Sequence, residues 1–187
     1  MRSKVNPKEI VLGHFATLKN VDGGWSWFDF ITFCCIPVLF GAFSVAAGFA
    51  LNKDITSLLV NFGAIFTALL LSVLVLVYDQ ESKLDERHQR DAELQRPADN
   101  LYPAKKRLLD ELYLNISYSI LSSLVLIAIC FAFSVADSFV DPKASSASIS
   151  LVFSKLVFTP AAVVVAVNLL LTIVMIVKRL HSLLRMK

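Results

Sequence analysis

Charged residues are scarce in this chain of 187 residues, where they make up 18% of the sequence, against about 25% in an average soluble domain. The shortage is concentrated in four stretches that contain no Asp, Glu, Lys or Arg. Each is about as long as the 20 or so residues that cross a bilayer. A soluble all-α protein would need a polar face on each helix, and these stretches have none. They are Phe30–Leu51, Ile55–Tyr78, Leu112–Ala136 and Leu156–Val177.

The chain also lacks the motifs of common enzymes and cofactor sites. It has no Gly-rich phosphate loop, no CxxC pair and no GxSxG elbow. Its three histidines, His14, His88 and His181, lie outside the apolar stretches and far apart. Asp85, His88 and Asp91 have helical i, i+3 spacing, but nothing completes a metal site, and a solvated charged helix explains them equally. We therefore predict no enzymatic activity and no catalytic, metal or cofactor site.

Ionisable residues are missing from the middle of every apolar stretch. Asp29, the nearest one, stands at an edge among aromatic residues. Proton-coupled transporters need such groups at membrane depth, so we expect no proton-coupled transport. Asn61, Asn115 and Asn168 lie inside the stretches and could line a pore or bond neighbouring helices, and we favour the helix contacts.

Cysteine is limited to Cys34, Cys35 and Cys130, all within apolar stretches. This placement does not indicate a disulfide framework. The Cys34-Cys35 pair suits either acylation or apolar packing, and we favour packing. No cleavable signal peptide is expected, because the first apolar stretch is long enough to span and remain in the membrane.

Positive charge is distributed unevenly along the chain. Fifteen of the 18 lysines and arginines lie before the first stretch, between the second and third, or after the fourth. Lys and Arg favour the cytoplasmic side of a membrane. The sequence therefore predicts an all-α membrane protein with four transmembrane helices, both termini in the cytoplasm, and a cytoplasmic helical extension between spans two and three.

This topology divides the chain into five parts. They are an interfacial lead (1–27), a first transmembrane hairpin (28–78), a cytoplasmic helical hairpin (79–111), a second transmembrane hairpin (112–177) and a basic tail (178–187). The composition of 80–95 favours a helix that continues past the second span. Pro97 and Pro103 bracket a break, and a helix is expected to restart at Ala104.

Residues 7–20 are expected to form a short amphipathic helix that begins at Pro7 and lies on the inner membrane surface. A partner-binding arm is the alternative. Trp25 and Trp27 follow it and are predicted to anchor the chain at the membrane interface.

Small and polar residues recur at helical spacing within the spans. Gly41, Ser44 and Gly48 allow close approach of another helix, within the subunit or between subunits, and we expect them to support self-association. Pro37 is expected to kink the first span, and Pro160 to separate a short outer segment from the fourth. Asn115, Ser119 and Ser122 share one face of the third span and suit interhelical hydrogen bonds.

The segment 79–111 carries the densest charge in the chain. Alternating signs on exposed helices can set the specificity of a docking partner, so its basic residues are the partner-docking candidates. The trio at 105–107 could also touch anionic lipid headgroups, although topology explains it as well. The candidates are Lys83, Arg87, Arg90, Arg96, Lys105, Lys106 and Arg107.

The whole layout resembles four-span membrane subunits of bacterial anti-phage systems, in particular the membrane component of Kiwa. The resemblance rests on the Gly24-Trp25-Ser26-Trp27-Phe28-Asp29 lead, the paired spans, the Leu76-Val77-Tyr78-Asp79-Gln80 exit and the cytoplasmic hairpin. It implies a homo-oligomer, with a tetramer expected, that senses phage attack at the bacterial inner membrane. It also implies a cytoplasmic DNA-binding partner subunit, with no direct binding of nucleic acid by this chain.

Two other classes fit the same sequence. One is an oligomeric pore or membrane-disrupting effector, and the other is a general scaffold without transport. Ion leakage on expression would favour the pore, whereas a co-purifying soluble protein that needs residues 79–111 would favour a sensor or scaffold.

Overall fold

The computed structural model describes residues 7–18, 27–97, 99–138 and 154–186, and these residues form helices without strands. Four segments among them are long and apolar enough to cross a membrane, which confirms the prediction of an all-helical chain with four candidate spans. They are Trp27–Ala46, Lys53–Glu93, Tyr102–Ser138 and Leu156–Arg185.

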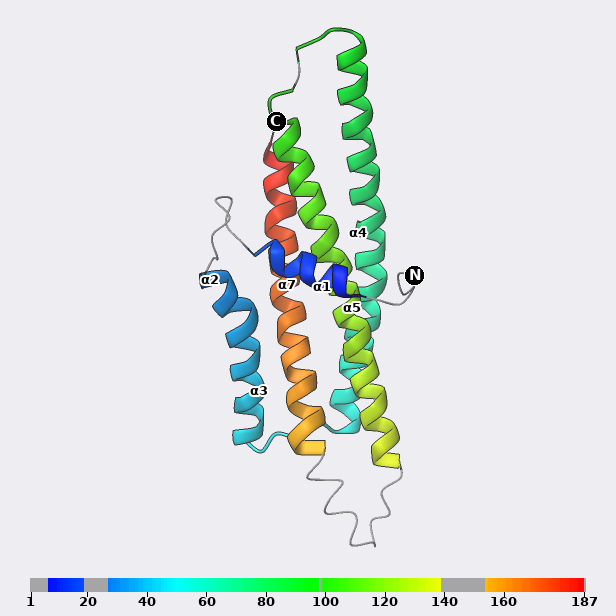
Figure 1. Cartoon of the computed structure of the whole chain (residues 1–187). Helices are drawn as coiled ribbons and strands as arrows, with labels where there is room; N and C mark the ends of the chain where they lie inside the picture. Colours follow the sequence, from blue (N-terminus) through cyan, green and yellow to red (C-terminus); the bar gives the residue numbers. More distant parts are fainter. Residues whose placement is uncertain (1–6, 19–26, 98, 139–153, 187) are drawn as a thin grey trace, which may run out of the picture.

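The long helices stand side by side in a row rather than in a closed bundle (Figure 1). The main contacts run from α3 (Ile36–Ala46) to α7 (Thr159–Arg185), from α7 to α5 (Tyr102–Ser138), and from α5 to α4 (Lys53–Glu93). The short α1 (Lys8–Ala16) crosses this row and packs on α5. A row of four helices encloses no central channel, so a pore would require several subunits.

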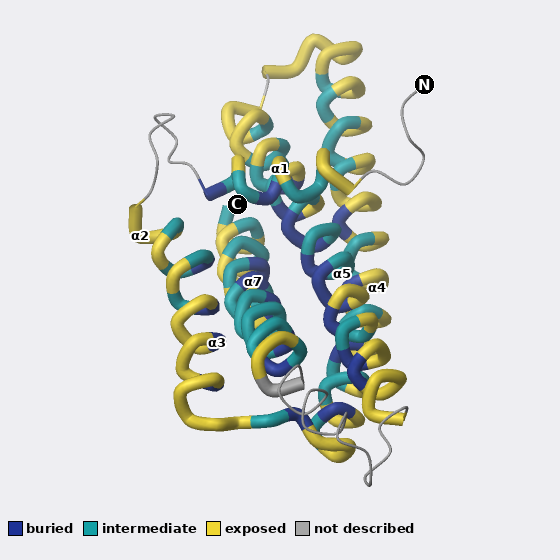
Figure 2. Tube along the Cα trace, turned by 60° about the horizontal axis from the view of Figure 1, so that its bottom comes forward, coloured by how far each residue is buried: buried dark blue, intermediate teal, exposed yellow. Residues whose placement is uncertain are grey.

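The packing of α4 on α5 follows a seven-residue repeat. On α4 the buried positions Thr56, Gly63, Leu70 and Val77 are spaced by seven. A period of 3.5 residues keeps one seam of a helix against its partner over a long distance. Figure 2 shows the buried side of α5 along most of its length. The matching buried series on α5 alternates steps of three and four: Leu109, Leu112, Ile116, Ser119, Ser123, Leu126, Cys130 and Phe133.

Small residues bring α4 and α5 closest near the middle of this seam. A Cβ added at Gly63 would lie 2.9 Å from Ile127 Cγ1 and 3.3 Å from the Ser123 carbonyl oxygen. The Thr67 hydroxyl bonds the Ser123 hydroxyl across the interface at 2.6 Å. Close backbone approach with hydroxyl bonds is how helices associate in lipid, where the surrounding solvent is as apolar as the side chains.

The first candidate span is interrupted where the sequence places Pro37. A π-helical turn (Ile31–Cys35) joins α2 (Trp27–Phe30) to α3. Because proline has no N–H, the Phe33 carbonyl oxygen lacks its usual donor four residues on. The Asn168 amide of α7 donates to this oxygen at 2.9 Å and so satisfies it. At the position of the predicted kink, the structure thus has a π-helical turn and an interhelical bond.

The first span ends earlier than the sequence boundary at Leu51. The helix stops at Ala46, and Gly48 has a φ of +67°. The Gly48 N–H bonds the Val45 oxygen at 3.0 Å, and the Phe49 N–H bonds the Ser44 oxygen at 2.9 Å. These two bonds form a Schellman motif, which glycine favours because its left-handed conformation costs it nothing.

The face predicted to support self-association is occupied within the chain. Gly41 and Ser44 are buried, and a Cβ at Gly41 would lie 2.6 Å from Val164 Cγ2 of α7. Gly48 lies past the end of α3 and has open space around it. Of the two alternatives for this face, the structure shows packing within the subunit, and Gly48 does not share the helical face.

The remaining helix ends agree closely with the sequence. Asn52 caps α4, its side-chain oxygen accepting from the Ile55 N–H at 2.8 Å. α4 extends to Glu93 and α5 begins at Tyr102, two residues before the predicted Ala104, so Pro97 lies between the two helices and Pro103 stands in the first turn of α5. A π-helical turn (Ser154–Phe158) precedes α7, and Pro160 stands in the first turn of that helix.

The N-terminal helix is shorter than the predicted 7–20. α1 covers Lys8–Ala16, and Pro7 stands one residue before it rather than within it. Thr17 and Leu18 form a turn, and the expected continuation past residue 18 lies outside the described residues, as does Trp25.

Candidate functional site

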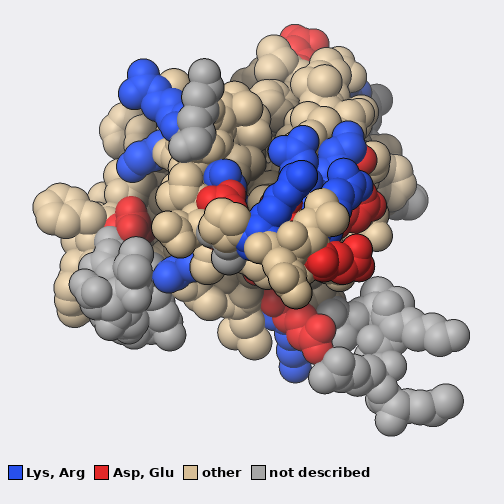
Figure 3. Space-filling model, turned by 90° about the horizontal axis from the view of Figure 1, so that it is seen from above, with Lys and Arg blue, Asp and Glu red and all other residues tan. Residues whose placement is uncertain are grey.

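The end of the molecule where α4 and α5 extend past the rest of the row carries the predicted docking residues. We call this the hairpin end. α1 and the C-terminal part of α7 lie toward the same end, while Lys53 stands at the opposite end of α4 (Figure 1). Viewed from the hairpin end, Lys and Arg side chains gather in groups with Asp and Glu beside them (Figure 3).

Most of the candidate docking residues form ion pairs with neighbouring carboxylates. Such exposed pairs contribute at most about 1 kcal/mol each to stability, but they reduce the charge that a partner would meet. The pairs are Lys83–Asp79 (2.7 Å), Arg96–Asp91 (3.7 Å), Lys105–Asp99 (3.0 Å), Lys106–Asp85 (2.6 Å) and Arg107–Glu111 (3.1 Å).

A polar cluster fastens α4 to α5 within the hairpin. Asp85 accepts hydrogen bonds from Lys106 at 2.6 and 2.8 Å and from the Tyr102 hydroxyl at 2.8 Å. These bonds lower the pKa of the Asp85 carboxyl, with the Lys106 bond the larger cause. His88 stacks on the Tyr102 ring, with ring centroids 3.8 Å apart. Asp85 and His88 are thus engaged by α5 side chains, and no metal-type group of three occurs in the described part of the chain.

Arg87 and Arg90 differ from the other candidates. Both are exposed, and neither forms an ion pair with any described residue. They stand one turn apart on α4, so they offer two uncompensated positive charges on the same side of the hairpin. Of the seven candidate docking residues, these two are therefore the ones whose charge no described residue pairs.

A second site lies where α1 crosses the row, and no sequence motif indicates it. His14 is fully buried, and its Nδ1 lies 2.8 Å from the Asn115 Oδ1 of α5. The Thr17 hydroxyl also donates to this oxygen at 3.0 Å. The His14 ring stacks on Tyr118, with centroids 3.9 Å apart and parallel planes.

Arg179 of α7 completes this site, which we call the polar anchor (His14, Thr17, Asn115 and Arg179). Its Nη2 donates to the Thr17 carbonyl oxygen at 2.9 Å and pairs with Glu111 Oε2 at 3.3 Å. A cation at the carbonyl end of a helix interacts favourably with the helix dipole. One guanidinium therefore joins α1, α5 and α7 at a single level.

The polar anchor holds His14 in its neutral form. Because the Asn115 oxygen accepts, the His14 Nδ1 carries the proton and Nε2 is the bare acceptor. Nε2 is buried and has no hydrogen-bond partner among the described residues. Protonation would place a charge there without solvent, so burial lowers the pKa of His14 to about 4, and the nearby Arg179 charge lowers it further.

The predicted asparagines have different environments. Asn115 belongs to the polar anchor, and Asn168 accepts from the Tyr118 hydroxyl at 2.9 Å while donating to the Phe33 oxygen. The expectation that they bond neighbouring helices is confirmed for both. Within the chain the prediction does not hold for Asn61, which lies exposed on α4 and whose side chain bonds no described residue.

The burial of His14, Thr17 and Arg179 was not predicted from the sequence. There, His14 is one of three histidines far apart, and Arg179 is one of the basic residues after the fourth apolar stretch. The only available signal was Asn115, a polar side chain near the same end of a span. The predicted anchor Trp27 begins α2 and is 73% exposed, which suits a side chain that faces lipid or an interface.

Comparisons with family models, with curated proteins and with solved structures found no match to this chain.

Proposed function

We propose that this protein is a multi-pass membrane scaffold or sensor subunit, and that its hairpin docks a soluble partner in the cytoplasm. The observation that supports this most directly is the pair Arg87 and Arg90, whose charges are not neutralised by described residues while the other five candidates are paired. Free charges at the end of a projecting helical hairpin give an approaching acidic surface its register and raise its encounter rate.

The membrane placement and orientation belong to the same proposal. Four apolar helices of spanning length support insertion in a membrane. The split of fifteen against three Lys and Arg supports a cytoplasmic hairpin and cytoplasmic termini. The resemblance to the membrane component of Kiwa supports the bacterial inner membrane, a role in anti-phage defence and a DNA-binding effector as the partner.

We also propose that the protein self-associates, through a face of α4 rather than through the α3 face predicted from the sequence. Asn61, Ala64, Ala68 and Ser72 form an exposed stripe along α4 within its apolar stretch. An amide in lipid without a hydrogen-bond partner is costly, and a second copy would offer one. Several hairpins would then gather on one side of the membrane, so that weak partner contacts gain by avidity.

The test of partner docking is charge reversal at Arg90. The protein is extracted in mild detergent, accompanying proteins are identified by mass spectrometry, and the wild type is compared with Arg90→Glu. We expect the accompanying protein to be lost from Arg90→Glu, and raised salt to weaken its association with the wild type. Lys53→Glu, a reversal at the opposite end of the same helix, is the matched control and should retain it.

Retention of the partner and of function by Arg90→Glu would remove the hairpin as the docking element. Ion leakage from cells that express this chain alone would instead favour the pore-forming alternative.

A further inference from the structure

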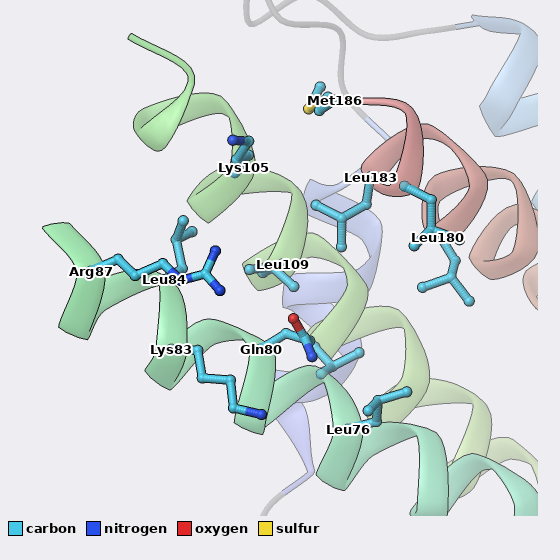
Figure 4. Close-up of a pocket in the computed structure, with 12 residues that line it drawn as sticks. Leu76, Gln80, Lys83, Leu84, Arg87, Lys105, Leu109, Leu180, Leu183 and Met186 are labelled. Carbon is cyan, nitrogen blue, oxygen red and sulfur yellow. The ribbon is translucent and has the colours of Figure 1, made fainter. Parts of the chain in front are cut away.

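A groove of about 400 Å³ lies at the hairpin end, between α4, the start of α5 and the last turns of α7. Its floor is made of leucines from all three helices, including Leu76, Leu109 and Leu183. Figure 4 shows Leu109 and Leu183 facing each other and Leu76 farther along the groove, with Lys105 and Lys83 on opposite sides of Arg87. The groove is therefore apolar along its base and basic along one side.

The basic side of the groove contains no acidic residue. Lys83, Arg87 and Lys105 line it together with the amide of Gln80, and no Asp or Glu is among the lining residues. Lys83 and Lys105 each have a carboxylate partner behind them, whereas Arg87 has none in the described structure. The Arg87 side chain extends over the groove toward Leu84 (Figure 4). The absence of acidic lining residues and the unpaired Arg87 favour an anionic ligand.

The groove begins where the apolar stretches end. Leu76 belongs to the stretch that closes at Tyr78, and Leu180 follows directly after Lys178 and Arg179. Lys83 is five residues beyond Tyr78, which is about 8 Å along a helix axis. The headgroup layer outside the hydrocarbon core is about 5–8 Å thick. Lys105 and Arg87 stand farther out, seven and nine residues from the apolar stretches, and Lys and Arg side chains bend back toward such a layer, which brings their charges nearer to it.

We propose that this groove binds an anionic phospholipid. The phosphate of the headgroup lies among Arg87, Lys105 and Lys83, and the beginning of an acyl chain lies along Leu76 and Leu180. Basic pockets between membrane helices are suited to anionic headgroups because they combine charge with an apolar surface. The proposal rests on the proposed membrane placement of the chain but does not require a protein partner.

The leucine floor distinguishes a lipid from a free phosphate. Free phosphate would use the basic side alone and leave the apolar base exposed to water, at a cost proportional to its area. A phospholipid covers both surfaces. The apolar base also continues the apolar run of α4 rather than standing apart from it, so an acyl chain can enter from the membrane.

The experiment measures lipid retention by the purified full chain. The protein in a neutral detergent is incubated with equal amounts of phosphatidylglycerol and phosphatidylcholine, and bound lipids are quantified by native mass spectrometry. We expect phosphatidylglycerol to be retained in preference to phosphatidylcholine. Arg87→Gln should reduce that retention about fivefold, the effect of one basic side chain near a headgroup. Arg90→Gln, a neighbour that does not line the groove, should retain it as the wild type does.

A second variant and a soluble competitor complete the test. Leu180→Gln should also reduce retention, because it interrupts the apolar half of the groove, and an excess of glycerol phosphate should not displace the lipid. Equal retention of the two lipids would overturn the proposal. So would an Arg87→Gln variant that behaves as wild type, an equal loss from Arg90→Gln, or full displacement by glycerol phosphate, which would indicate a site for soluble anions. If Arg90→Glu loses the protein partner but retains the lipid as the wild type does, lipid binding and partner docking are shown to be separate.

Discussion

At the scale of single residues, His14 makes the placement of α1 sensitive to pH. Its pKa is about 4 in the folded protein, below its ordinary value of 6.5. At a pH between these two pKa values, His14 is protonated when α1 is undocked from α5 and neutral when α1 is docked. Docking is therefore fully favourable above about pH 6.5 and weakens as the pH falls toward 4. The difference in pKa corresponds to a loss on the order of 3 kcal/mol.

We expect acidification from pH 7 to pH 4.5 to release α1 from α5 while the long helices stay folded. Hydrogen exchange of residues 8–16, followed by mass spectrometry, measures this directly, since exchange should rise several-fold at the lower pH after correction for the intrinsic rate. His14→Gln, whose amide cannot take up a proton, should remove most of the pH dependence. His181→Gln changes an exposed histidine outside the polar anchor and is the control. Equal pH dependence in His14→Gln would show that another group controls α1.

At the scale of helix pairs, the seam between α4 and α5 depends on Gly63. Gly63→Leu would force a side chain against Ile127 and the Ser123 backbone, so we expect a loss of about 1–3 kcal/mol. For a chain of this size that lowers the melting temperature by roughly 2–12 °C. Ala128→Leu adds similar bulk at an exposed position of α5, outside the stripe proposed for self-association, and should change it little. A thermal melt in detergent compares the two, and equal melting temperatures would show that the seam tolerates the bulk.

Substitutions on the two small-residue faces, one on α4 and one on α3, should affect self-association differently. Asn61→Leu should shift the association equilibrium about fivefold toward the monomer, because one interhelical amide bond in lipid contributes about 1 kcal/mol. Gly41→Leu should instead destabilise the contact of α3 with α7 and leave the oligomeric mass unchanged. Mass photometry in detergent provides the measurement. If Gly41→Leu dissociates the protein and Asn61→Leu does not, the α3 face suggested by the sequence is the interface after all.

At the scale of the whole molecule, the position of positive charge predicts orientation. The hairpin end holds α1, the last turns of α7 and the described residues of the 79–111 segment, and Lys53 marks the other end. In a variant with Cys34, Cys35 and Cys130 replaced by Ala, a single cysteine at position 53 should react with an impermeant maleimide in intact cells. A cysteine at position 90 should react only after the cells are permeabilised. Reaction at position 90 from outside would reverse the topology.

The elements of this protein follow from its sequence because their causes are local. Apolar runs without charge define the long helices, Asn52 and Gly48 stand where one helix begins and another ends, and the polar composition after Tyr78 carries α4 beyond its apolar stretch. Each of these depends on neighbours within a few residues. The same holds for the break around Pro97 and Pro103, since proline restricts its own backbone and that of the residue before it.

The functional surfaces depend on residues far apart in the chain, and the tertiary structure decides them. His14 meets Asn115 across 101 positions, and Arg179 meets Thr17 across 162. Which of seven basic residues keep a free charge depends on how α4 and α5 align, as does the lining of the groove around Arg87. From the sequence alone, the small-residue face of α3 could pack on any other helix, and the tertiary structure shows that it packs on α7. A periodic pattern indicates that a helix has a packing face, but only the arrangement of all the helices determines what that face meets.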